Sequence, residues 1–324
     1  MLRTNGKLSY DLTVRYSTLA ASSYPTTRLK TKCGYIAITG RPNVGKSTLL
    51  NRLIGQKLSI TAHKPQTTRH ALLGINTTPT AQFIFVDTPG IHRGGKRTLN
   101  RVLNKTASTA ATGADVLVLV VQALVWNEHD EMALETLQKQ DVPWILAVNK
   151  TDRVNPKERL LPWLSELEAA AQADAVIPVS ATRGDNLDVL RDELESRLPY
   201  ADFQFDEEAL TDRSSKFLAS ELVREQLTRF LAQELPYSVS VEIEKFEQTE
   251  KIAKISAVIW VEKASQKSIV IGKGGANLKE IGSRARRQMQ KLFDTKVHLE
   301  LWVKIKDGWS DDAAMIRNLG YGDQ

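Results

Sequence analysis

The sequence predicts an α/β domain with a mostly parallel sheet and helices on both faces, followed by a smaller α+β domain. Residues 33–201 alternate short apolar strands with helical stretches, which is typical of a parallel sheet covered on both faces. A glycine-rich loop joins the first of these strands to the first helix. A polar, acidic connector is predicted over Tyr200–Asp212. Residues 202–324 contain most of it and the second domain, in which a long helical stretch is followed by strands with alternating polar and apolar residues. A chain of 324 residues is long enough for both domains.

Residues 1–32 are predicted to be a poorly ordered extension, because they are rich in hydroxyl and basic side chains and show no periodicity. Asp11 is their single acidic residue. The same composition is typical of an organellar transit peptide, and a misassigned translation start, for instance one at Leu29, is a third option. The sequence leaves these three alternatives open.

Charge and cysteine content narrow the classes of protein that this chain can represent. The net charge is +6, of which residues 1–32 contribute +5, residues 33–201 +2 and residues 202–324 −1, so the bulk charge says little about partners. The single cysteine, Cys33, excludes an intramolecular disulfide and suits a reducing compartment. No apolar run in the sequence reaches the roughly 18 residues that a membrane-spanning helix requires.

The predicted strands of the first domain end close to polar residues. Ligands bind at the carboxyl ends of the strands in open α/β sheets, so these polar residues are the first candidates for a site. The predicted strands are Tyr35–Thr39, Gln82–Asp87, Val116–Gln122, Trp144–Asn149 and Ala175–Val179.

The segment Gly40–Ser47 matches the pattern G-x-x-x-x-G-K-S and lies between a predicted strand and a predicted helix over residues 48–54. In this setting the backbone N–H groups of the loop wrap phosphates at the helix N-terminus. Lys46 is expected to reach the outer phosphates and the Ser47 hydroxyl to bind Mg²⁺. A chance glycine-rich turn is the less favoured interpretation, because it does not explain the flanking strand and helix. The candidate nucleotide-binding residues here are Gly40, Asn43, Val44, Gly45, Lys46, Ser47 and Thr48.

Two further loops are candidates for sensing the γ-phosphate. Asp87 begins an Asp-x-x-Gly motif, in which the carboxylate can hold the Mg²⁺ shell and the N–H of Gly90 can turn to the γ-phosphate. The polar segment 65–70 contains Thr67 and Thr68, and a threonine hydroxyl there can complete the Mg²⁺ shell. Each segment alone would be an ordinary loop. Their positions after the phosphate loop favour a nucleotide-dependent switch.

The segment Asn149–Asp152, with Lys150 inside it, indicates selection of guanine. The Asp152 carboxylate can accept hydrogen bonds from N1–H and the 2-amino group of guanine, two donors that adenine lacks. Ser180 and Ala181 follow the next predicted strand and would place a backbone N–H at the guanine carbonyl. Alone, this four-residue motif is weak evidence for guanine binding and could be an ordinary loop. Together with the phosphate loop and the Asp-x-x-Gly motif, it indicates guanine selection.

Together these segments resemble a translation-factor-class GTPase. The residues of the three segments that start at Gly40, Pro65 and Asp87 resemble those of the Era GTPase family in particular. This resemblance runs from Cys33 to the C-terminus. It implies an enzyme that converts GTP and water to GDP and phosphate, with Mg²⁺ as its cofactor.

The resemblance also implies the catalytic residues, which are Lys46, Asn43, Gly90 and Ile91. Ile91 stands where Ras-like proteins carry the glutamine that orients water, so intrinsic hydrolysis is expected to be slow. Asn43 resembles an asparagine that helps to hold K⁺ in related GTPases, where the ion acts much as an arginine finger does. His70 and His92 are interpreted as solvated loop side chains rather than as bases.

The second domain shows the pattern of a KH domain. An amphipathic helix is predicted over Asp212–Glu234, followed by strands around residues 239–244, 255–261 and 299–305. Between the last two strands, the loop Gly272–Gly275 has the form Gly-x-x-Gly between two helical stretches, and such a loop clamps about four nucleotides of RNA. The order of elements is that of the prokaryotic, type II variant.

A local basic patch accompanies this loop. Residues 273–296 carry a net charge of +5, although residues 202–324 as a whole carry −1. A basic patch beside a KH loop is the expected footprint of single-stranded RNA, while a solvated helix face is the alternative for residues 284–287. The candidate RNA-binding residues are Gly272, Lys273, Gly274, Gly275, Lys279, Arg284 and Arg287.

The resemblance implies a ribosome-assembly GTPase that binds the 3′ end of 16S rRNA and assists maturation of the 30S subunit. It implies GTP, GDP, small-subunit rRNA and the 30S subunit as partners, and a monomer. The expected location is cytoplasmic, with peripheral contact to the inner membrane as an option and the mitochondrial matrix as the alternative if residues 1–32 are a transit peptide. The alternative function is a signalling GTPase whose second domain docks protein or membrane.

Overall fold

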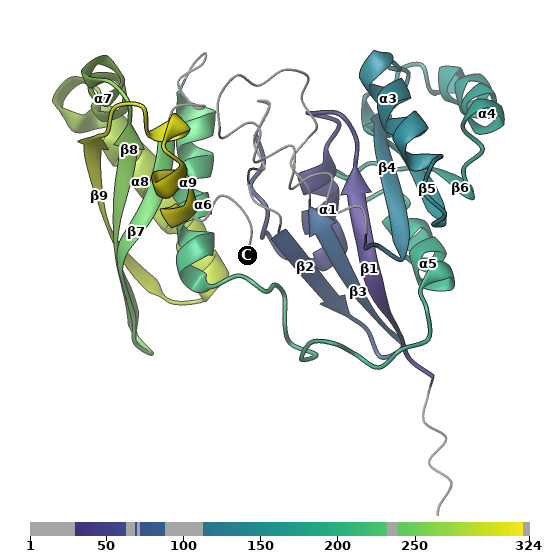
Figure 1. Ribbon diagram of the computed structural model, residues 1–324, viewed down its shortest axis with the longest axis horizontal. Helices are drawn as coiled ribbons and strands as arrows, with labels where there is room; N and C mark the ends of the chain where they lie inside the picture. Colours follow the sequence, from purple (N-terminus) through teal and green to yellow (C-terminus); the bar gives the residue numbers. More distant parts are fainter. Residues whose placement is uncertain (1–29, 63–68, 70–71, 88–112, 232–238, 320–324) are drawn as a thin grey trace, which may run out of the picture.

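The computed structural model describes residues 30–62, 69, 72–87, 113–231 and 239–319, and it arranges them around two separate sheets (Figure 1). The first sheet has six strands in the order β2-β3-β1-β4-β5-β6, and the second has three in the order β7-β8-β9. No helix of the described part is long and apolar enough to cross a membrane.

The first sheet is parallel except at one edge, where β2 runs antiparallel to β3. Its strands are β1 (Lys32–Thr39), β2 (Leu72–Thr77), β3 (Ala81–Asp87), β4 (Val116–Gln122), β5 (Trp144–Asn149) and β6 (Ala175–Pro178). The edge strand β2 is absent from the sequence-based predictions. Gly74 interrupts its apolar pattern, and a Cβ at this position would lie 2.2 Å from Cδ1 of Ile54 in the packed helix α1 (Lys46–Ile54). Gly74 therefore allows α1 to pack closely against β2. Because it also interrupts the apolar pattern, the strand is not predicted from the sequence.

Helices cover both faces of this sheet, as predicted. The helices α1 and α5 pack with one set of strand side chains, and α3 and α4 pack with the set on the opposite face. The helical elements are α1 (Lys46–Ile54), α3 (Glu128–Leu137), α4 (Leu160–Ala171) and α5 (Leu187–Arg197), with 3₁₀ turns η1 (Thr151–Arg153) and η2 (Lys157–Arg159).

A connector without regular structure leads from the first sheet to the second domain, along the lower edge of Figure 1. The buried amide of Gln82 in β3 holds it, because its oxygen accepts hydrogen bonds from the N–H groups of Gln204 and Phe205 at 2.9 and 3.0 Å. Its nitrogen donates to the carbonyl of Phe205 over 2.8 Å. Further along, Ile75 N–H donates to Leu210 O. The connector is thus fastened to the first sheet before the next helix, α6 (Ser215–Phe230), begins.

The second domain has the predicted order of elements. These are α6 (Ser215–Phe230), β7 (Val239–Gln248), β8 (Ile252–Val261), α7 (Ala264–Ile271), the 3₁₀ turn η4 (Lys273–Gly275), α8 (Ala276–Phe293) and β9 (Lys296–Ile305), followed by η5 (Trp309–Asp311) and α9 (Ala313–Asn318). β7 and β8 are antiparallel, whereas β8 and β9 are parallel. The closing segment η5–α9 is not among the sequence-based predictions. It buries Trp309 completely, in a small cluster with Met315 and Ile316.

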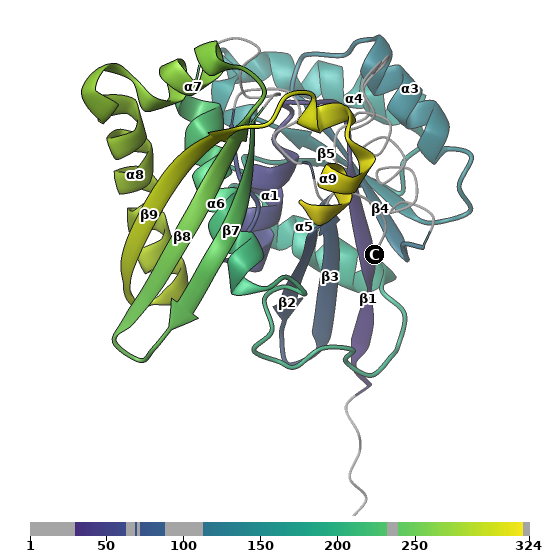
Figure 2. The ribbon, with the colours of Figure 1, turned by 60° about the vertical axis from the view of Figure 1, so that its left-hand side comes forward.

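Helix α6 differs from its sequence-based prediction in three ways. It ends at Phe230 rather than at Glu234, because Leu231 has an extended backbone. It begins at Ser215 rather than at Asp212, because the hydroxyl of Ser214 caps the helix by accepting a hydrogen bond from Phe217 N–H. Its polar side is also buried, although an amphipathic surface helix would leave that side in water. Leu218 joins the core of the first domain, while the next apolar residues join the core of the second. Figure 2 shows α6 between α1 and the second sheet, which explains this two-sided burial.

Candidate nucleotide site and nucleic-acid groove

The phosphate loop between β1 and α1 depends on glycine at two positions. Gly40 has a φ of +135°, and a Cβ there would lie 2.3 Å from the carbonyl oxygen of Val120 in β4. Gly45 has a φ of +108°, and a Cβ there would lie 2.3 Å from the Nδ2 atom of Asn149. Only glycine adopts these conformations without strain while allowing such close approach. The loop is thereby fixed against β4 and the end of β5.

Lys46 is folded back along the loop. Its side chain is buried, and its ammonium donates hydrogen bonds to the carbonyl oxygens of Gly40 at 2.7 Å and Arg41 at 3.1 Å. Burial lowers the pKa of Lys46 to about 8, the negative charge of Asp87 opposes this shift, and the positive charge of Arg41 adds to it. Among the described residues, the hydrogen-bond acceptors of the Lys46 ammonium are thus carbonyl oxygens and not a carboxylate. A bound phosphate group would place a negative charge beside this ammonium.

Ser47 and Asp87 form an oxygen pair that fits Mg²⁺. The Ser47 hydroxyl donates to Asp87 Oδ2 over 3.2 Å, and the Ser59 hydroxyl donates to the same oxygen over 2.6 Å. Asp87 is fully buried at the end of β3. Mg²⁺ prefers hard oxygen ligands and is commonly held by one or two protein groups together with phosphates. The Ser47 hydroxyl and the Asp87 carboxylate are protein oxygens of this kind.

The predicted guanine-binding residues meet at the ends of β5 and β6. Asn149 is buried and connects the phosphate loop to the loop after β6. Its Nδ2 donates a hydrogen bond to the carbonyl of Val44 at 2.8 Å, and its Oδ1 accepts one from Ala181 N–H at 3.0 Å. The Asp152 carboxylate accepts a hydrogen bond from the Ser180 hydroxyl over 2.7 Å. The predicted backbone donor of Ala181 is therefore engaged by Asn149 in this structure.

Lys150 crosses from the base-binding loop to the phosphate loop. Its ammonium donates to the carbonyl oxygen of Asn43 and, over 2.8 Å, to the side-chain oxygen of Gln122. Burial lowers the pKa of Lys150, with added effects from Arg153 and Arg41 and opposition from Asp152. Both Lys150 and Asn43 have a left-handed backbone, with φ values of 66°. These contacts hold the two halves of the site at a fixed separation.

A cavity of about 560 Å³ runs between these two halves. This volume lies within the range of about 300–1,000 Å³ that is typical of small-ligand sites. Its walls include residues absent from the sequence-based prediction, of which two come from the second domain. The lining residues are Asn43, Gly45, Thr48, Thr61, Ala62, Asn149, Lys150, Arg153, Thr182, Thr228 and Arg229.

Four predicted site residues lie outside the described part of the chain. Thr67 and Thr68 belong to residues 63–68, and Gly90 and Ile91 belong to residues 88–112. The roles assigned to them remain predictions, as do the interpretations of His70 and His92.

Arg41 adds a support that the motif itself does not reveal. Its Nε lies 2.9 and 3.1 Å from the two carboxylate oxygens of Asp130, which is fully buried in the first turn of α3. Asp130 also accepts a hydrogen bond from Asn127 N–H and so completes the capping box of α3. Burial raises the pKa of Asp130, and the charge of Arg41 opposes that rise. The spacing of Asn127 and Asp130 is a readable signal for the cap, but not for the ion pair.

In the second domain, the Gly-x-x-Gly loop joins α7 to α8 in a conformation that suits glycine. Gly272, Gly274 and Gly275 have φ values of 73°, 59° and 80°. A Cβ on Gly272 would lie 2.5 Å from the Asn277 side chain, whereas a Cβ on Gly274 would meet nothing within 4 Å in the described structure. Gly272 therefore shapes the loop, while Gly274 leaves its outer surface open to an approaching chain.

A groove of about 440 Å³ lies beside this loop, between α8 and β9. Of the predicted RNA-binding residues it includes Gly275 and Lys279, and it adds Arg286 and His298, which the prediction missed. Arg284 and Arg287 do not line it: Arg284 pairs with Glu280 over 2.6 Å, and Arg287 Nε lies 3.4 Å from Ser283 O. The helical period explains the difference, because positions 279, 282, 283 and 286 share a face that 284 and 287 leave.

Comparisons with known proteins agree with this geometry. The model of the family described as 50S ribosome-binding GTPase matches residues 35–150, and the KH domain family matches residues 234–310. GTPase Era of Pseudomonas syringae pv. tomato is 54% identical over 293 residues, which are 90% of this chain and 98% of that protein. GTPase Era of Pseudomonas aeruginosa (strain LESB58) is 53% identical over 292 residues, with 90% and 96% covered.

Two solved structures have nearly the same fold. One is Era in complex with MgGDPNP and nucleotides 1506–1542 of 16S ribosomal RNA, and the other is a variant of Aquifex aeolicus Era with a single tyrosine-to-alanine substitution, bound to GDP·AlF₄⁻. Each gives a TM-score of 0.86 and 36% sequence identity, and covers 90% of this chain and 100% of the other.

Proposed function

The chain belongs to the Era family of GTPases, and from this membership we propose that it binds the 3′ end of 16S rRNA and assists maturation of the 30S subunit. It is an enzyme that hydrolyses GTP, with a P-loop domain followed by a KH domain. The observation that carries the RNA proposal is the open Gly274 position beside a groove with cationic walls, in the same chain as a nucleotide cavity.

In the nucleotide site, each residue has a physical task. Lys46 neutralises charge on the outer phosphates, and the phosphate loop supplies N–H donors. Ser47 and Asp87 would hold Mg²⁺, which neutralises the charge that develops on the phosphate oxygens when bound. Asp152 selects guanine because it accepts hydrogen bonds from N1–H and the 2-amino group, two donors that adenine lacks. We assign Gly90, Ile91, Thr67 and Thr68 the switch roles given above, also as proposals.

The alternative function, a signalling GTPase that docks protein or membrane through its second domain, is not favoured. A relative that is 36% identical and covers 90% of this chain was solved with 16S ribosomal RNA. We further propose a cytoplasmic location for a monomer, a domain boundary near residue 201, and a K⁺ ion beside Asn43. Cys33 is buried as a free thiol, which suits a reducing compartment.

The RNA proposal is tested with a substitution that adds charge and little else. In Gly274→Asp the new side chain has open space, and aspartate tolerates the left-handed φ of 59°. Affinity for a labelled RNA of nucleotides 1506–1542 of 16S rRNA should fall at least tenfold, equivalent to about 1.4 kcal/mol. The control Gln248→Asp adds the same charge at the exposed end of β7 and should bind RNA normally. Unchanged affinity in Gly274→Asp, with GTP binding intact, would reject the proposed RNA site.

A further inference from the structure

Helix α6 of the second domain forms part of the wall of the nucleotide cavity. Thr228 and Arg229, from its last turn, line the cavity together with Thr61 and Ala62 of the first domain. The cavity's other walls belong to the phosphate loop and to the base-binding loop. Arg229 therefore presents a guanidinium of the second domain to the cavity.

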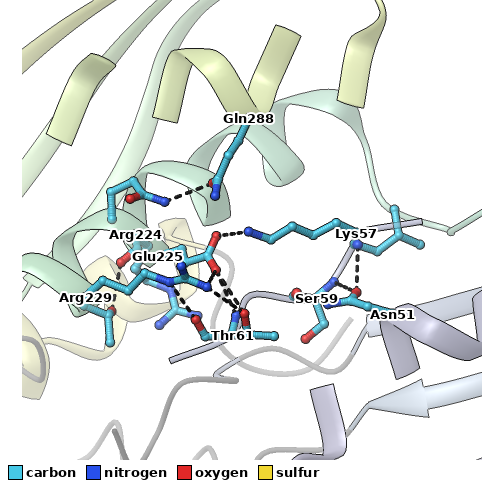
Figure 3. A network of polar contacts seen from close by, with 11 residues as sticks. Asn51, Lys57, Ser59, Thr61, Arg224, Glu225, Arg229 and Gln288 are labelled. Carbon is cyan, nitrogen blue, oxygen red and sulfur yellow. Dashed lines mark hydrogen bonds and ion pairs between the residues drawn. The ribbon is translucent and has the colours of Figure 1, made fainter. Parts of the chain in front are cut away.

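Arg229 holds Thr61 with two hydrogen bonds. Its Nε donates to the Thr61 carbonyl oxygen over 2.9 Å, and its Nη2 donates to the Thr61 hydroxyl over 2.8 Å (Figure 3). The planar guanidinium is suited to such two-point contact, whereas the ammonium of lysine is not. Main-chain and side-chain atoms of Thr61 are thus fixed by one residue of the other domain.

Glu225, one turn earlier in α6, completes the contact. Its carboxylate has no exposed surface, and it pairs with Lys57 at 2.5 Å and with Arg229 at 2.7 Å. It also accepts hydrogen bonds from the N–H and the hydroxyl of Thr61, both at 3.2 Å. A buried carboxylate is costly without such partners, so these contacts fix the position of α6 against the first domain.

The segment that Thr61 belongs to also reaches the magnesium-binding residues. Ser59 donates its hydroxyl to Asp87 over 2.6 Å, and its carbonyl accepts from the Asn51 amide over 2.7 Å. Ile60 alone therefore separates the contact with Asp87 from the contact with α6. Residues 57–61 are therefore anchored to Asp87 through Ser59 and to the other domain through Lys57 and Thr61. Figure 3 shows the contacts of Lys57 and Thr61 with α6.

We infer that Glu225 and Arg229 form a clasp on Thr61 that retains bound nucleotide, so that the second domain controls nucleotide escape. This inference rests on the proposed nucleotide site. The clasp comprises Glu225, Arg229 and Thr61, and it closes the wall of the cavity between the two halves of the site. Loss of the clasp frees that wall, which shortens the lifetime of the complex.

The test measures dissociation of a fluorescent GDP analogue from the full chain after mixing with excess GDP. Arg229→Ala should accelerate dissociation about five- to tenfold, as expected for the loss of two hydrogen bonds at a half-exposed side chain. Arg229→Lys keeps the charge but not the two-point contact, and should also accelerate release. Lys216→Ala removes a cation from the exposed first turn of α6, at the opposite end of the helix from the cavity, and should leave the rate unchanged.

A double-mutant cycle separates retention from general loosening. Thr61→Val removes the hydroxyl that Arg229 and Glu225 share, so its effect and that of Arg229→Ala should be less than additive. Additive effects, or an unchanged rate in Arg229→Ala with an unchanged melting temperature, would overturn the clasp while the nucleotide site stands. Failure of the unmutated chain to bind the GDP analogue would reject the proposed function and the clasp together.

Discussion

At the scale of single residues, Lys46 shows how the nucleotide site is prepared for its ligand. Its ammonium is buried against two carbonyl oxygens rather than against an anion. Because burial disfavours the charged form, the pKa of Lys46 is lowered to about 8. A bound polyphosphate brings several negative charges to the same place, and opposite charge raises the pKa of an ammonium again. Nucleotide binding is therefore linked to the protonation of Lys46.

The sign of this linkage gives the first prediction. Well below a pH of about 8, Lys46 is protonated before and after binding, so no proton is exchanged there. Above that pH the free protein holds Lys46 mainly neutral, and binding of GDP should take up close to one proton per nucleotide near pH ~9. Affinity should accordingly fall by up to about tenfold per pH unit in this range. Calorimetry in two buffers of different ionisation enthalpy measures the uptake, and its absence in the alkaline range would contradict the assignment.

Asn43 gives a second prediction at this scale. It is exposed at the edge of the cavity with a φ of 66°, a conformation that asparagine tolerates and alanine does not favour. If its side chain helps to hold K⁺, GTP turnover should be faster in K⁺ than in Na⁺, and Asn43→Ala should abolish the difference. Asn43→Gly removes the same amide without backbone strain and must behave alike. Turnover of the unmutated protein at equal rates in both salts would exclude the ion.

At the scale of elements, the ion pair between Arg41 and Asp130 fastens the phosphate loop to α3. Asp130→Ala removes the partner of a largely buried guanidinium and one half of the capping box, so the free energy of unfolding should drop by about 3–5 kcal/mol. Asn127→Ala removes the other half of the cap alone and should cost about 1 kcal/mol. Denaturant unfolding of both variants gives the difference. Equal losses would mean that the pair contributes nothing beyond the cap.

The elements also show what can be predicted from the sequence and what cannot. The carboxyl ends of the strands that lead into site residues agree with their predictions to within one residue, because the strands are continuous apolar runs bounded by recognisable loops. The start of β1 is predicted less well, since the strand begins at Lys32 rather than at Tyr35. The edge strand β2 is not predicted, because Gly74 interrupts its apolar pattern. The packing of α1 against this position requires a glycine. Helix α6 is predictable, but its buried polar side is not. Periodicity reports that one face of a helix is apolar, and it cannot report that a second domain covers the other.

The same limit applies to the site. Gly40–Ser47, Asp87 and Asn149–Asp152 are local motifs, and their neighbours in space follow from the order of the strands. Arg229 is far from all of them in the sequence, and nothing in its immediate sequence surroundings indicates a nucleotide. Likewise, charge alone does not distinguish Arg286 from Arg284 and Arg287, whereas the face of α8 that turns to β9 places Arg286 along the groove. Contacts between domains and the rotation of a helix are set by tertiary packing.

At the scale of the whole molecule, the connector and the clasp join the domains, alongside the packing of Leu218 in the first core and the hydrogen bond from Arg69 to the carbonyl of Val239. The connector is fastened to β3 through Gln82, away from the nucleotide, and it limits how far the second domain can travel. The clasp on Thr61 lies at the wall of the nucleotide cavity. A change in the clasp would act on α6, which carries part of the second domain's core. The groove proposed to bind RNA lies along α8, which packs directly against α6.

This arrangement leads to a prediction of reciprocal coupling between RNA and nucleotide. If RNA prefers one orientation of the second domain, its affinity should differ between protein loaded with GDP and with a non-hydrolysable GTP analogue. Coupling free energies between sites are typically about 1–3 kcal/mol, which corresponds to a roughly 5- to 150-fold change in affinity. Linkage requires RNA to change the ratio of the two nucleotide affinities by the same factor.

The measurement is a titration of one short RNA against both nucleotide states, followed by the reverse titrations. Arg229→Ala should reduce the coupling factor while leaving RNA affinity in the more weakly binding state nearly unchanged, because the substitution does not touch the groove. A coupling factor that survives Arg229→Ala would route communication through the connector or through residues 63–68 and 88–112 instead. Equal RNA affinities in both states of the unmutated protein would mean that the chain carries two independent binding domains.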